Sequence, residues 1–512
     1  MYSIEYSENL RPILVDWKRA SEGLATQPHV ACHKAEYFSN FCRSWWTFAG
    51  KADTYGVGQR SRVYRENFMS FSGVFARAVA VVGAGALYWR RMQGAAPKAA
   101  WGSSPAIPEA KPQGAIPTLK MPTAQGWSEG QKPTAAPGLK VNAFAAQLNH
   151  PRWLYVLPNG DVLAAETDGP GEVIKRPKEI IMKMVMNKVN AELPRNHRII
   201  LLRDADGDGV AEFRSVLLEH LKSPFGMTLV GNSLYVADTD ALLRYPYREG
   251  ATKIPETPVK VADLPAGPIN HHWTKNVIAS RDGSKLYVTV GSNSNAGENG
   301  AENEVDRAAI LEIDARTGAK RVFAFGIRNP NGMDWEPSSG MLWTVANERD
   351  EIGDDLVPDY ITSVRPGAFY GWPYSYYGQH VDARPYPKRP DLVARAIKPD
   401  YAIGSHTGSL GLTFANGNRL GPAYASGAFV GQHGSWNRRQ RSGYKVIFIP
   451  FAGGKPSGMP RDVLTGFLAG GGRTHGRPVG VVIDKRGGLL VADDAGNMVW
   501  RVTAAAPARP AT

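Results

Sequence analysis

The chain has 512 residues with a formal net charge of +13, and 43% of the residues are hydrophobic. This is enough apolar material for a full core, and the positive charge is spread along the chain. No basic run with interleaved aromatic side chains exists, so we expect no nucleic-acid partner. The 55 glycines and 37 prolines predict many turns between short strands. Both cysteines, Cys32 and Cys42, lie near the N-terminus, so the rest of the chain has no disulfide framework and no thiolate metal site.

The N-terminal part predicts export. Residues 1–70 show no clear period and form either an accessory segment or sequence upstream of a misassigned start codon. Within residues 71–92, the apolar run 74–89 is short for a membrane span, which takes about 20 residues. It matches the core of a signal peptide in length, with basic residues before it. We therefore expect a signal peptide or a short membrane anchor, and a periplasmic or exported protein; a buried helix is the alternative.

Residues 93–140 are rich in Ala, Pro, Gly and Lys. Such a composition cannot bury enough apolar surface to fold alone, which predicts a linker. The folded body is therefore expected to begin near Val141 and to extend over residues 141–505.

A pattern recurs within this body: an apolar segment, a turn with Gly, Asn or Asp, and an alternating strand that ends in a small or acidic residue. Six copies begin near Trp153, Gly226, Asn276, Gly332, Gly411 and Gly480. Repetition of one strand unit predicts an all-β fold, a six-bladed β-propeller in which each blade covers its neighbours. Two insertions interrupt it: Pro177 to Asn196, with helical spacing, and residues 348–407, which are long and aromatic. Long loops on one face of a propeller are where ligands bind.

An acidic turn places carboxylates at alternate positions of a Gly-rich segment. Its candidate ligands are Asp204, Asp206, Asp208 and Glu212. This spacing aims several hard oxygens at one point, as Ca²⁺ requires. The twelfth ligand of an EF-hand is absent, because Ser215 occupies that position. We expect a structural Ca²⁺ in a hairpin loop; a solvated acidic turn is the alternative.

The turn Gly326–Gly332 contains Arg328, two asparagines and a proline between two apolar strands, and the acidic run Asn347–Asp355 follows the second strand. Gly, Pro and Asn at this density indicate a turn. A plain hairpin loop with a solvated arginine is one interpretation. The other is a site in which the acidic run holds a cation together with a ligand.

His272 precedes the third copy of the repeat at the position that Arg328 has in the fourth copy. Equivalent repeat positions in a propeller surround one axial face, so we expect these two side chains near each other. A histidine there can act as a general base near neutral pH. A packed or surface histidine is the alternative. No serine-hydrolase elbow, phosphate loop or dinucleotide fingerprint occurs in the sequence.

These residues resemble a known family. The segment Gly-Ile-Arg-Asn-Pro-Asn-Gly from Gly326, the run Asn-Glu-Arg-Asp-Glu from Asn347, Phe-Tyr-Gly-Trp-Pro from Phe369 and Gly-Arg-Pro from Gly476 are similar to the soluble pyrroloquinoline quinone (PQQ) sugar dehydrogenases. The sequences of these motifs most resemble the L-sorbosone dehydrogenase-like branch of that family. The resemblance covers about residues 141–505 and does not extend to the first 140 residues.

The resemblance implies residue roles. His272 would take the proton of the sugar C1 hydroxyl while a hydride passes to the quinone, and Arg328 would lie beside the quinone oxygen where negative charge develops. The implied cofactor-binding set is Arg328, Asn329, Asn331, Trp372, Arg438 and Arg477, the last two suited to the cofactor's carboxylates. The implied ligands of a catalytic Ca²⁺, a Lewis acid on the quinone, are Glu348, Arg349 and Asp350.

The sequence departs from the glucose-oxidising branch at two places. That branch has glutamine where Asn331 stands, and it has a quinone-contacting glutamine in its second blade, where this chain has only Ser223-Pro224-Phe225-Gly226. The expected function is PQQ- and Ca²⁺-dependent oxidation of an aldose or related sugar aldehyde at C1, with electrons passing to a quinone or a cytochrome. The alternatives are a calcium-dependent lactonase on the same fold and a non-catalytic binding propeller.

Overall fold

The structure is a computed structural model, and it describes residues 100–112, 118, 120–170 and 196–505. These residues belong to one compact unit, residues 90–512; a second unit, residues 1–89, lies outside the described part. The predicted signal peptide or anchor at 71–92 is outside it as well, and so is the helical insertion from Pro177 to Asn196, except for its last residue. No helix in the described part is long and apolar enough to cross a membrane.

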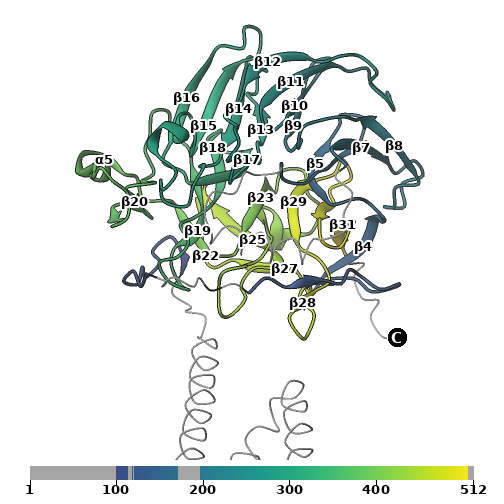
Figure 1. Cartoon of the computed structure of the whole chain (residues 1–512). Helices are drawn as coiled ribbons and strands as arrows, with labels where there is room; N and C mark the ends of the chain where they lie inside the picture. Colours follow the sequence, from purple (N-terminus) through teal and green to yellow (C-terminus); the bar gives the residue numbers. More distant parts are fainter. Residues whose placement is uncertain (1–99, 113–117, 119, 171–195, 506–512) are drawn as a thin grey trace, which may run out of the picture. The chain divides into compact units, whose positions relative to one another are not determined.

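Six antiparallel sheets make up the described body, each built on a four-stranded blade, which confirms the predicted six-bladed β-propeller (Figure 1). Additional short strands extend two of the sheets. The first three blades are β5–β8 (Pro151–Val156, Val162–Glu166, Arg198–Arg203, Phe213–Leu218), β9–β12 (Met227–Val230, Ser233–Ala237, Ala241–Pro246, Val259–Asp263) and β13–β16 (Val277–Ala279, Lys285–Val290, Ala309–Asp314, Lys320–Phe325).

The other three blades are β17, β18, β19 and β22 (Asn329–Trp335, Leu342–Asn347, Pro358–Ser363, Tyr401–Ser405), β23, β24, β25 and β27 (Ser409–Phe414, Gly427–Gln432, Lys445–Ala452, Arg461–Thr465), and β29, β30, β31 and β4 (Pro478–Ile483, Leu489–Asp493, Met498–Ala504, Leu139–Ala145). The outer strand of the sixth blade thus comes from the N-terminal side of the body: β4 pairs with β31. This pairing joins the two ends of the propeller domain within one sheet.

The core lies between the blades. The described part contains six buried apolar clusters, and each one joins residues of neighbouring blades. The cluster of the first and second blades also includes Leu410 of β23 and Val479 of β29. Leu286 of β14 packs with Tyr235 of β10, for example, and Leu490 of β30 packs with Leu154 of β5. Each blade therefore buries both of its faces against its neighbours. This packing explains why one strand pattern recurs six times.

Glycines in the inner strands allow these strands to approach each other. A Cβ atom on Gly226 would lie 2.3 Å from the backbone nitrogen of Val277 in the next blade, and one on Gly411 would lie 2.2 Å from the carbonyl oxygen of Val479. Both distances are too short for any side chain. The glycines that begin several copies of the repeat are thus required by close backbone contact around the axis.

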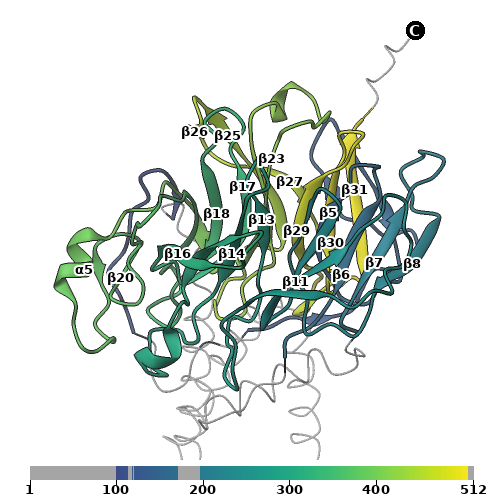
Figure 2. The same cartoon turned by 90° about the horizontal axis from the view of Figure 1, so that it is seen from above.

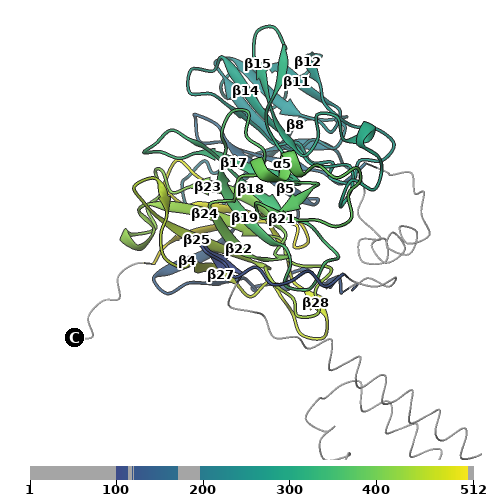
Figure 3. The same cartoon turned by 90° about the vertical axis from the view of Figure 1, so that its left-hand side faces the viewer.

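The structure differs from the prediction in the described part of the segment 93–140, which is not a free linker. The short strands β1 (Trp101–Gly102), β2 (Thr123–Ala124) and β3 (Thr134–Ala135) pair with β22, β28 (Arg473–Thr474) and β27, respectively. Figure 3 shows this dark blue segment running along β22, β27 and β28. Each strand is only two residues long, so it produces no periodic pattern, and its pairing energy comes from edges that other blades provide.

The remaining elements are loops and short insertions. They are η1 (Ala301–Glu304), β20 (Ser375–Tyr376), β21 (His380–Val381), α5 (Pro390–Arg395), η2 (Pro422–Tyr424) and β26 (Lys455–Pro456). The hairpin of β20 and β21 and the helix α5 project from the outer side of the fourth blade (Figure 2). They belong to the long aromatic insertion that the sequence places between residues 348 and 407.

Candidate active site

We call the end of the ring at which the six inner strands begin the mouth. The inner strands β5, β9, β13, β17, β23 and β29 surround the centre in Figure 1. His272 lies just before β13, and Arg328 lies just before β17. The backbone connects them, because Ser292 accepts from the amide of His272 at 3.3 Å and donates to the carbonyl of Arg328 at 2.8 Å. The equivalent repeat positions are thus close in space, as the sequence predicts.

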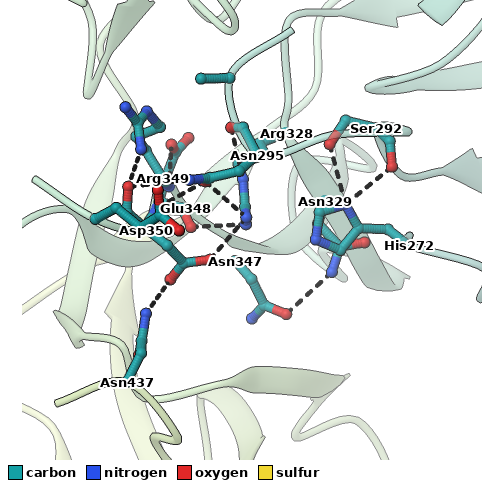
Figure 4. A network of polar contacts seen from close by, with 12 residues as sticks. His272, Ser292, Asn295, Arg328, Asn329, Asn347, Glu348, Arg349, Asp350 and Asn437 are labelled. Carbon is teal, nitrogen blue, oxygen red and sulfur yellow. Dashed lines mark hydrogen bonds and ion pairs between the residues drawn. The ribbon is translucent and has the colours of Figure 1, made fainter. Parts of the chain in front are cut away.

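Arg328 is almost completely buried, with 2% of the residue exposed. Its guanidinium donates to the carbonyl and the side-chain oxygen of Asn295 at 3.2 and 3.0 Å, and to the carbonyl of Glu348 at 2.7 Å. Its Nη2 also pairs with Asp350 at 2.7 Å (Figure 4). The arginine is therefore held in one orientation, and a carboxylate compensates its charge.

Asp350 joins several loops at the mouth. Besides Arg328, its carboxylate contacts His406 at 3.2 Å and accepts from Asn437 at 2.5 Å, and its amide donates to Asn295 at 3.0 Å. Burial raises the pKa of this carboxyl, but Arg328 and His406 outweigh burial and hold the pKa below its ordinary range. The group is an anion at neutral pH, and it links the loops of three blades.

His272 has the geometry of a neutral general base. Its Nδ1 lies 2.9 Å from the carbonyl oxygen and 3.0 Å from the hydroxyl of Ser292. A carbonyl can only accept, so Nδ1 carries the hydrogen and Nε2 keeps its lone pair; Nε2 has no partner among the described residues. Burial lowers the pKa of the ring well below its ordinary value, and the charge of Arg328 lowers it further.

Asn329 and Asn331 differ in accessibility to a ligand. Asn329 donates to Asn347 at 3.2 Å, and its own Oδ1 is buried without a partner. A Cβ atom on Gly291 would lie 2.5 Å from this oxygen and 2.4 Å from Cβ of His272, so only glycine fits between them. Asn331 is fully buried and accepts from Thr274 at 2.9 Å. It acts inside the protein, supporting β17.

The side chains of the predicted calcium ligands point to separate partners. Glu348 accepts from the amide of Arg349 at 3.0 Å, and burial raises its pKa to about 7. Arg349 pairs with Asp382 at 2.5 Å and contacts the carbonyl of Asp350, which anchors the long insertion to the mouth. The carboxylates of Glu348 and Asp350 are thus engaged with different groups.

The remaining predicted residues surround the same loops. Trp372 is buried and donates from its ring nitrogen to the carbonyl of Asn295 at 2.9 Å. Arg438 binds the carbonyl of Asp354 at 2.9 Å and the carboxylate of Asp355 at 2.7 Å. These contacts hold the two loops together and leave little of the Arg438 guanidinium for a ligand.

Arg477 lies before β29, at the repeat position of His272 and Arg328. Its Nε and Nη2 each donate to a backbone carbonyl, those of His433 and Gly434, at 3.0 Å. Its guanidinium also lies 5.5 Å from the ring centre of Tyr444. Its Nη1 has no partner among the described residues, so it can face a ligand.

Sequence reasoning missed Ser292, Asn295, His406 and Asn437. The first two lie in the polar run Ser-Asn-Ser-Asn directly after β14, where the second strand of the blade ends at the mouth. That signal was available, because a polar run after a buried strand of a propeller faces the ligand end. His406 and Asn437 carried no such pattern.

Comparison with known proteins identifies the family of the propeller. The TrAA12-like family matches residues 133–368 and 380–505. The chain belongs to this family. It is also 28% identical over 294 residues to an uncharacterized protein of Borreliella burgdorferi, a match that covers 55% of this chain and 76% of that protein.

Two matches of this TrAA12-like protein connect it with sugar dehydrogenases. It is 25% identical over 230 residues to the pyrroloquinoline quinone-dependent pyranose dehydrogenase of Coprinopsis cinerea, covering 35% of this chain and 30% of that enzyme. It is 29% identical over 127 residues to the aldose sugar dehydrogenase YliI of Escherichia coli, covering 25% of this chain and 32% of that enzyme. The matched region therefore spans about a third of each curated dehydrogenase.

Solved structures support the same fold. The holo form of the PQQ domain of the Coprinopsis cinerea pyranose dehydrogenase has a TM-score of 0.58 at 19% identity, covering 75% of this chain and 100% of that one. The calcium structure of the Trichoderma reesei family AA12 enzyme has a TM-score of 0.59 at 17% identity, covering 76% and 99%. The TrAA12-like chain thus shares the propeller fold of these enzymes.

The acidic turn of the TrAA12-like protein forms the predicted hairpin loop between β7 and β8. One carboxylate oxygen from each of Asp204, Asp206, Asp208 and Glu212 lies within 4.8 Å of the others. Asp204 also pairs with Arg486 at 2.7 Å. In the described part of the chain, this is the one cluster of at least three such side chains that could hold a metal ion.

The residues at the mouth fit a planar, oxygen-rich quinone. Asn329 presents a buried acceptor without a donor, His272 presents an open ring nitrogen, and Arg328, the residue before Asn329, provides a buried positive charge. A buried polar atom without a partner is costly, which favours a ligand that completes it. PQQ, with its ring nitrogens, carboxylates and quinone oxygens, supplies groups of both kinds.

Proposed function

We propose that the protein is a PQQ-dependent sugar dehydrogenase that oxidises an aldose or related sugar aldehyde at C1. The observation that carries this proposal is the open Nε2 of His272, held in its neutral form beside Arg328 and Asn329. Membership of the TrAA12-like family and the similarity to the pyranose dehydrogenase support it.

In this function His272 accepts the proton of the sugar C1 hydroxyl at Nε2. The carbonyl of Ser292 holds Nδ1–H at 2.9 Å, which fixes the tautomer and stabilises the ring when it becomes charged. Arg328, fixed by Asn295 and Asp350, presents a preorganised positive group that does not need to move during the reaction. PQQ, when bound, would supply the two-electron acceptor, with Ca²⁺ as a Lewis acid on it.

Asn329 and Arg477 have polar atoms left to hold the cofactor. The guanidinium of Arg328 is engaged with the protein, so it would act on the cofactor through its fixed positive charge. The buried Asn331, Trp372 and Arg438 would support them from behind, since their polar groups are engaged with the protein. The carbonyls and carboxylates of the loop from Glu348 to Asp350 would offer oxygen ligands to the catalytic Ca²⁺, and the acidic turn between β7 and β8 would bind a separate structural Ca²⁺.

The finer proposals follow the sequence resemblance. They are an L-sorbosone dehydrogenase-like specificity, a quinone or cytochrome as electron acceptor, export to the periplasm, and membrane anchoring by residues 74–89. Each of them rests on the motifs around Arg328 and on the apolar run near the N-terminus.

Reconstitution tests the proposed function. Purified full-length protein is mixed with PQQ and Ca²⁺, and the reduction of an artificial dye is followed with a panel of aldoses. We expect dye reduction that falls by about 10²- to 10⁴-fold in His272→Ala, the usual contribution of a general base. The exposed His380→Gln, which removes a ring of the same kind from the hairpin of β20 and β21, serves as the matched control and should keep activity within about twofold of the wild type.

The outcomes separate the candidate functions. A wild-type protein that neither shifts the absorbance of PQQ nor reduces the dye contradicts the dehydrogenase. Hydrolysis of sugar lactones with Ca²⁺ alone would indicate the lactonase instead. Binding of PQQ without turnover by any sugar would leave a binding propeller as the function.

A further inference from the structure

A second polar cluster lies at the mouth, where the sixth and first blades meet. Its centre is Asp494, which follows β30 and is 1% exposed at its side chain. The carboxylate contacts Arg152 of β5 at 3.0 Å, Nε2 of His433 at 2.8 Å and Nε2 of His150 at 3.5 Å. Nothing in the mechanism around Arg328 uses this cluster.

Arg152 is the member of the cluster whose donors are not satisfied. Its Nη1 binds Asp494, but its Nε is buried without a partner and its Nη2 has none among the described residues. The guanidinium lies 5.7 Å from the ring centre of Trp273, the residue that follows the base His272. A buried N–H without an acceptor is costly, so this arrangement calls for an oxygen from outside the chain.

The unsatisfied edge has a clear chemical preference. The Nε–Nη2 edge of a guanidinium matches the two oxygens of a carboxylate. Other arginines of this chain use that same edge. Arg203, for example, holds Asp161 with both distances at 2.7 Å, and Arg321 holds Glu312 at 2.9 and 3.0 Å. In Arg152 no carboxylate of the described residues occupies this edge, because Asp494 contacts Nη1 alone.

We propose that Arg152 binds a carboxylate group of the ligand at the mouth, and that Asp494 and Trp273 position its guanidinium for this contact. The carboxylate belongs either to the cofactor or to an acidic sugar such as a uronic acid. This role rests on the proposed function, since it assigns one more contact to the same site. In this role, Arg152 contacts the ligand from the first blade, opposite the loops that carry Arg328.

The alternative, that Arg152 serves only to pair with Asp494, agrees less well with the contacts. His433 donates to the same carboxylate at two distances, 2.8 and 3.0 Å, so Asp494 has other donors. Burial lowers the pKa of the Arg152 guanidinium, and the charges of Asp494 and of Asp168 oppose this shift, so Asp494 is not the one carboxylate that acts on Arg152. A lysine could also form a salt bridge with Asp494. An arginine that served only this purpose would leave its Nε–Nη2 edge without a partner.

Two variants of the full-length protein test the subsite. Arg152→Lys keeps the positive charge but loses the two parallel N–H donors of the guanidinium. The double variant R152Q/D494N removes both charges, so that neither charge is left buried without its partner. Arg248→Gln, an exposed arginine without a described side-chain partner, is the matched control. Thermal unfolding of each variant shows whether it is folded before binding is measured.

The measurements distinguish the two sources of the carboxylate. PQQ binding is titrated with Ca²⁺ by absorbance, without sugar, and binding of galacturonate and galactose, which differ at C6 by the carboxylate, is measured by thermal shift and by KM. We expect Arg152→Lys and the double variant to weaken either PQQ binding or galacturonate binding by about 10- to 100-fold, the usual effect of losing a charge-assisted pair. Galactose binding and the Arg248→Gln control should stay within about twofold.

Each outcome decides a separate point. Weaker PQQ binding assigns the contact to the cofactor, and weaker galacturonate binding with unchanged PQQ binding assigns it to an acidic sugar. Folded variants that bind both ligands like the wild type overturn the subsite but leave the proposed function intact. If the wild type does not bind PQQ, the proposed function fails, and the thermal shift by galacturonate then decides the subsite alone: a wild-type shift lost in the variants supports it, and no shift overturns it.

Discussion

At the scale of single residues, the candidate site depends on compensation of charge. Arg328 is buried, and Asp350 neutralises it at 2.7 Å, so that the pair as a whole brings no net charge to the mouth. What remains available to a ligand is a fixed local field, positive on the side of the guanidinium. His272 experiences that field, because the charge of Arg328 is one of the causes that lower its pKa.

Removal of Arg328 is therefore expected to shift the pH profile. In Arg328→Gln the pKa of His272 rises, because the positive charge is lost and the charge of Asp350 is no longer balanced. A base must be deprotonated to act, so the acidic limb of kcat/KM moves to higher pH. Arg328→Lys keeps the charge and should keep the limb near that of the wild type. Dye reduction across pH 4 to 9 measures this; an unchanged acidic limb in the folded Gln variant would contradict it.

Asp350 should contribute to stability in a pH-dependent way. Asp350→Asn leaves Arg328 buried without its carboxylate, which costs roughly 3–5 kcal/mol at neutral pH. The pKa of Asp350 is depressed in the folded protein, so its stabilisation is present above the ordinary aspartate pKa, about 4, and is lost as pH falls below it. Urea unfolding at several pH values measures the difference. Asp462→Asn, from an exposed pair with Lys445, should change stability by less than about 1 kcal/mol.

The sequence could predict Arg328 and His272 because the repeat places them at equivalent positions. It could not predict Asn295 and Asn437 as partners of Asp350, because they lie 55 and 87 residues away from it and contact it only after three blades have folded. The side chains around Asp350 are defined by the hydrogen bonds that they make, and such partners produce no periodic pattern in the sequence. The sequence thus predicts the position of a residue within its repeat, but it does not predict the contacts between blades.

At the scale of elements, the acidic turn between β7 and β8 forms the loop that the sequence predicts, but its contact with Arg486 was not predicted. The sequence indicated the hairpin and the spacing of its carboxylates, and the structure brings four of them within 4.8 Å. Arg486, from the turn that precedes β30, could not be anticipated, because the sixth blade lies beside the first only after the ring closes. The positive charge of Arg486 offsets part of the repulsion among the carboxylates of the turn.

Calcium should stabilise the protein through this turn. Ca²⁺ in excess, at about 100 times its Kd, would add about 2.7 kcal/mol to the free energy of unfolding. The double variant Asp206→Asn/Asp208→Asn should lose most of this gain, while Glu256→Gln, an exposed acid outside the cluster, should keep it. Thermal unfolding with Ca²⁺ and with a chelator measures the effect. Equal responses of the double variant and the control to Ca²⁺ would show that the turn is only a solvated acidic loop.

At the scale of the whole molecule, the propeller depends on a segment that its repeat does not reveal. Strands β1 and β3 extend the fourth and fifth blades, and the ring nitrogen of Trp127 donates to Asp493 at 2.7 Å. The amide of Lys120 also donates to the carbonyl of Trp436, next to Asn437 at the mouth. Composition predicted a linker here because the segment is poor in apolar residues, but a few aromatic anchors are enough when the blades supply the partner edges.

Truncation at two positions tests this dependence. A chain that begins at residue 98 keeps every described contact of the segment, while one that begins at residue 137 loses β1, β3 and the packing of Trp127 against Phe467 and Trp500. Loss of the half-buried tryptophan alone should cost about 1–3 kcal/mol, less than a fully buried one would, and the lost strand pairs add to it. We expect the longer chain to unfold in urea like the full-length protein and the shorter one at a clearly lower midpoint. Trp127→Ala in the longer chain should reproduce part of the loss; equal midpoints of the two chains would show that the segment only lies on the surface.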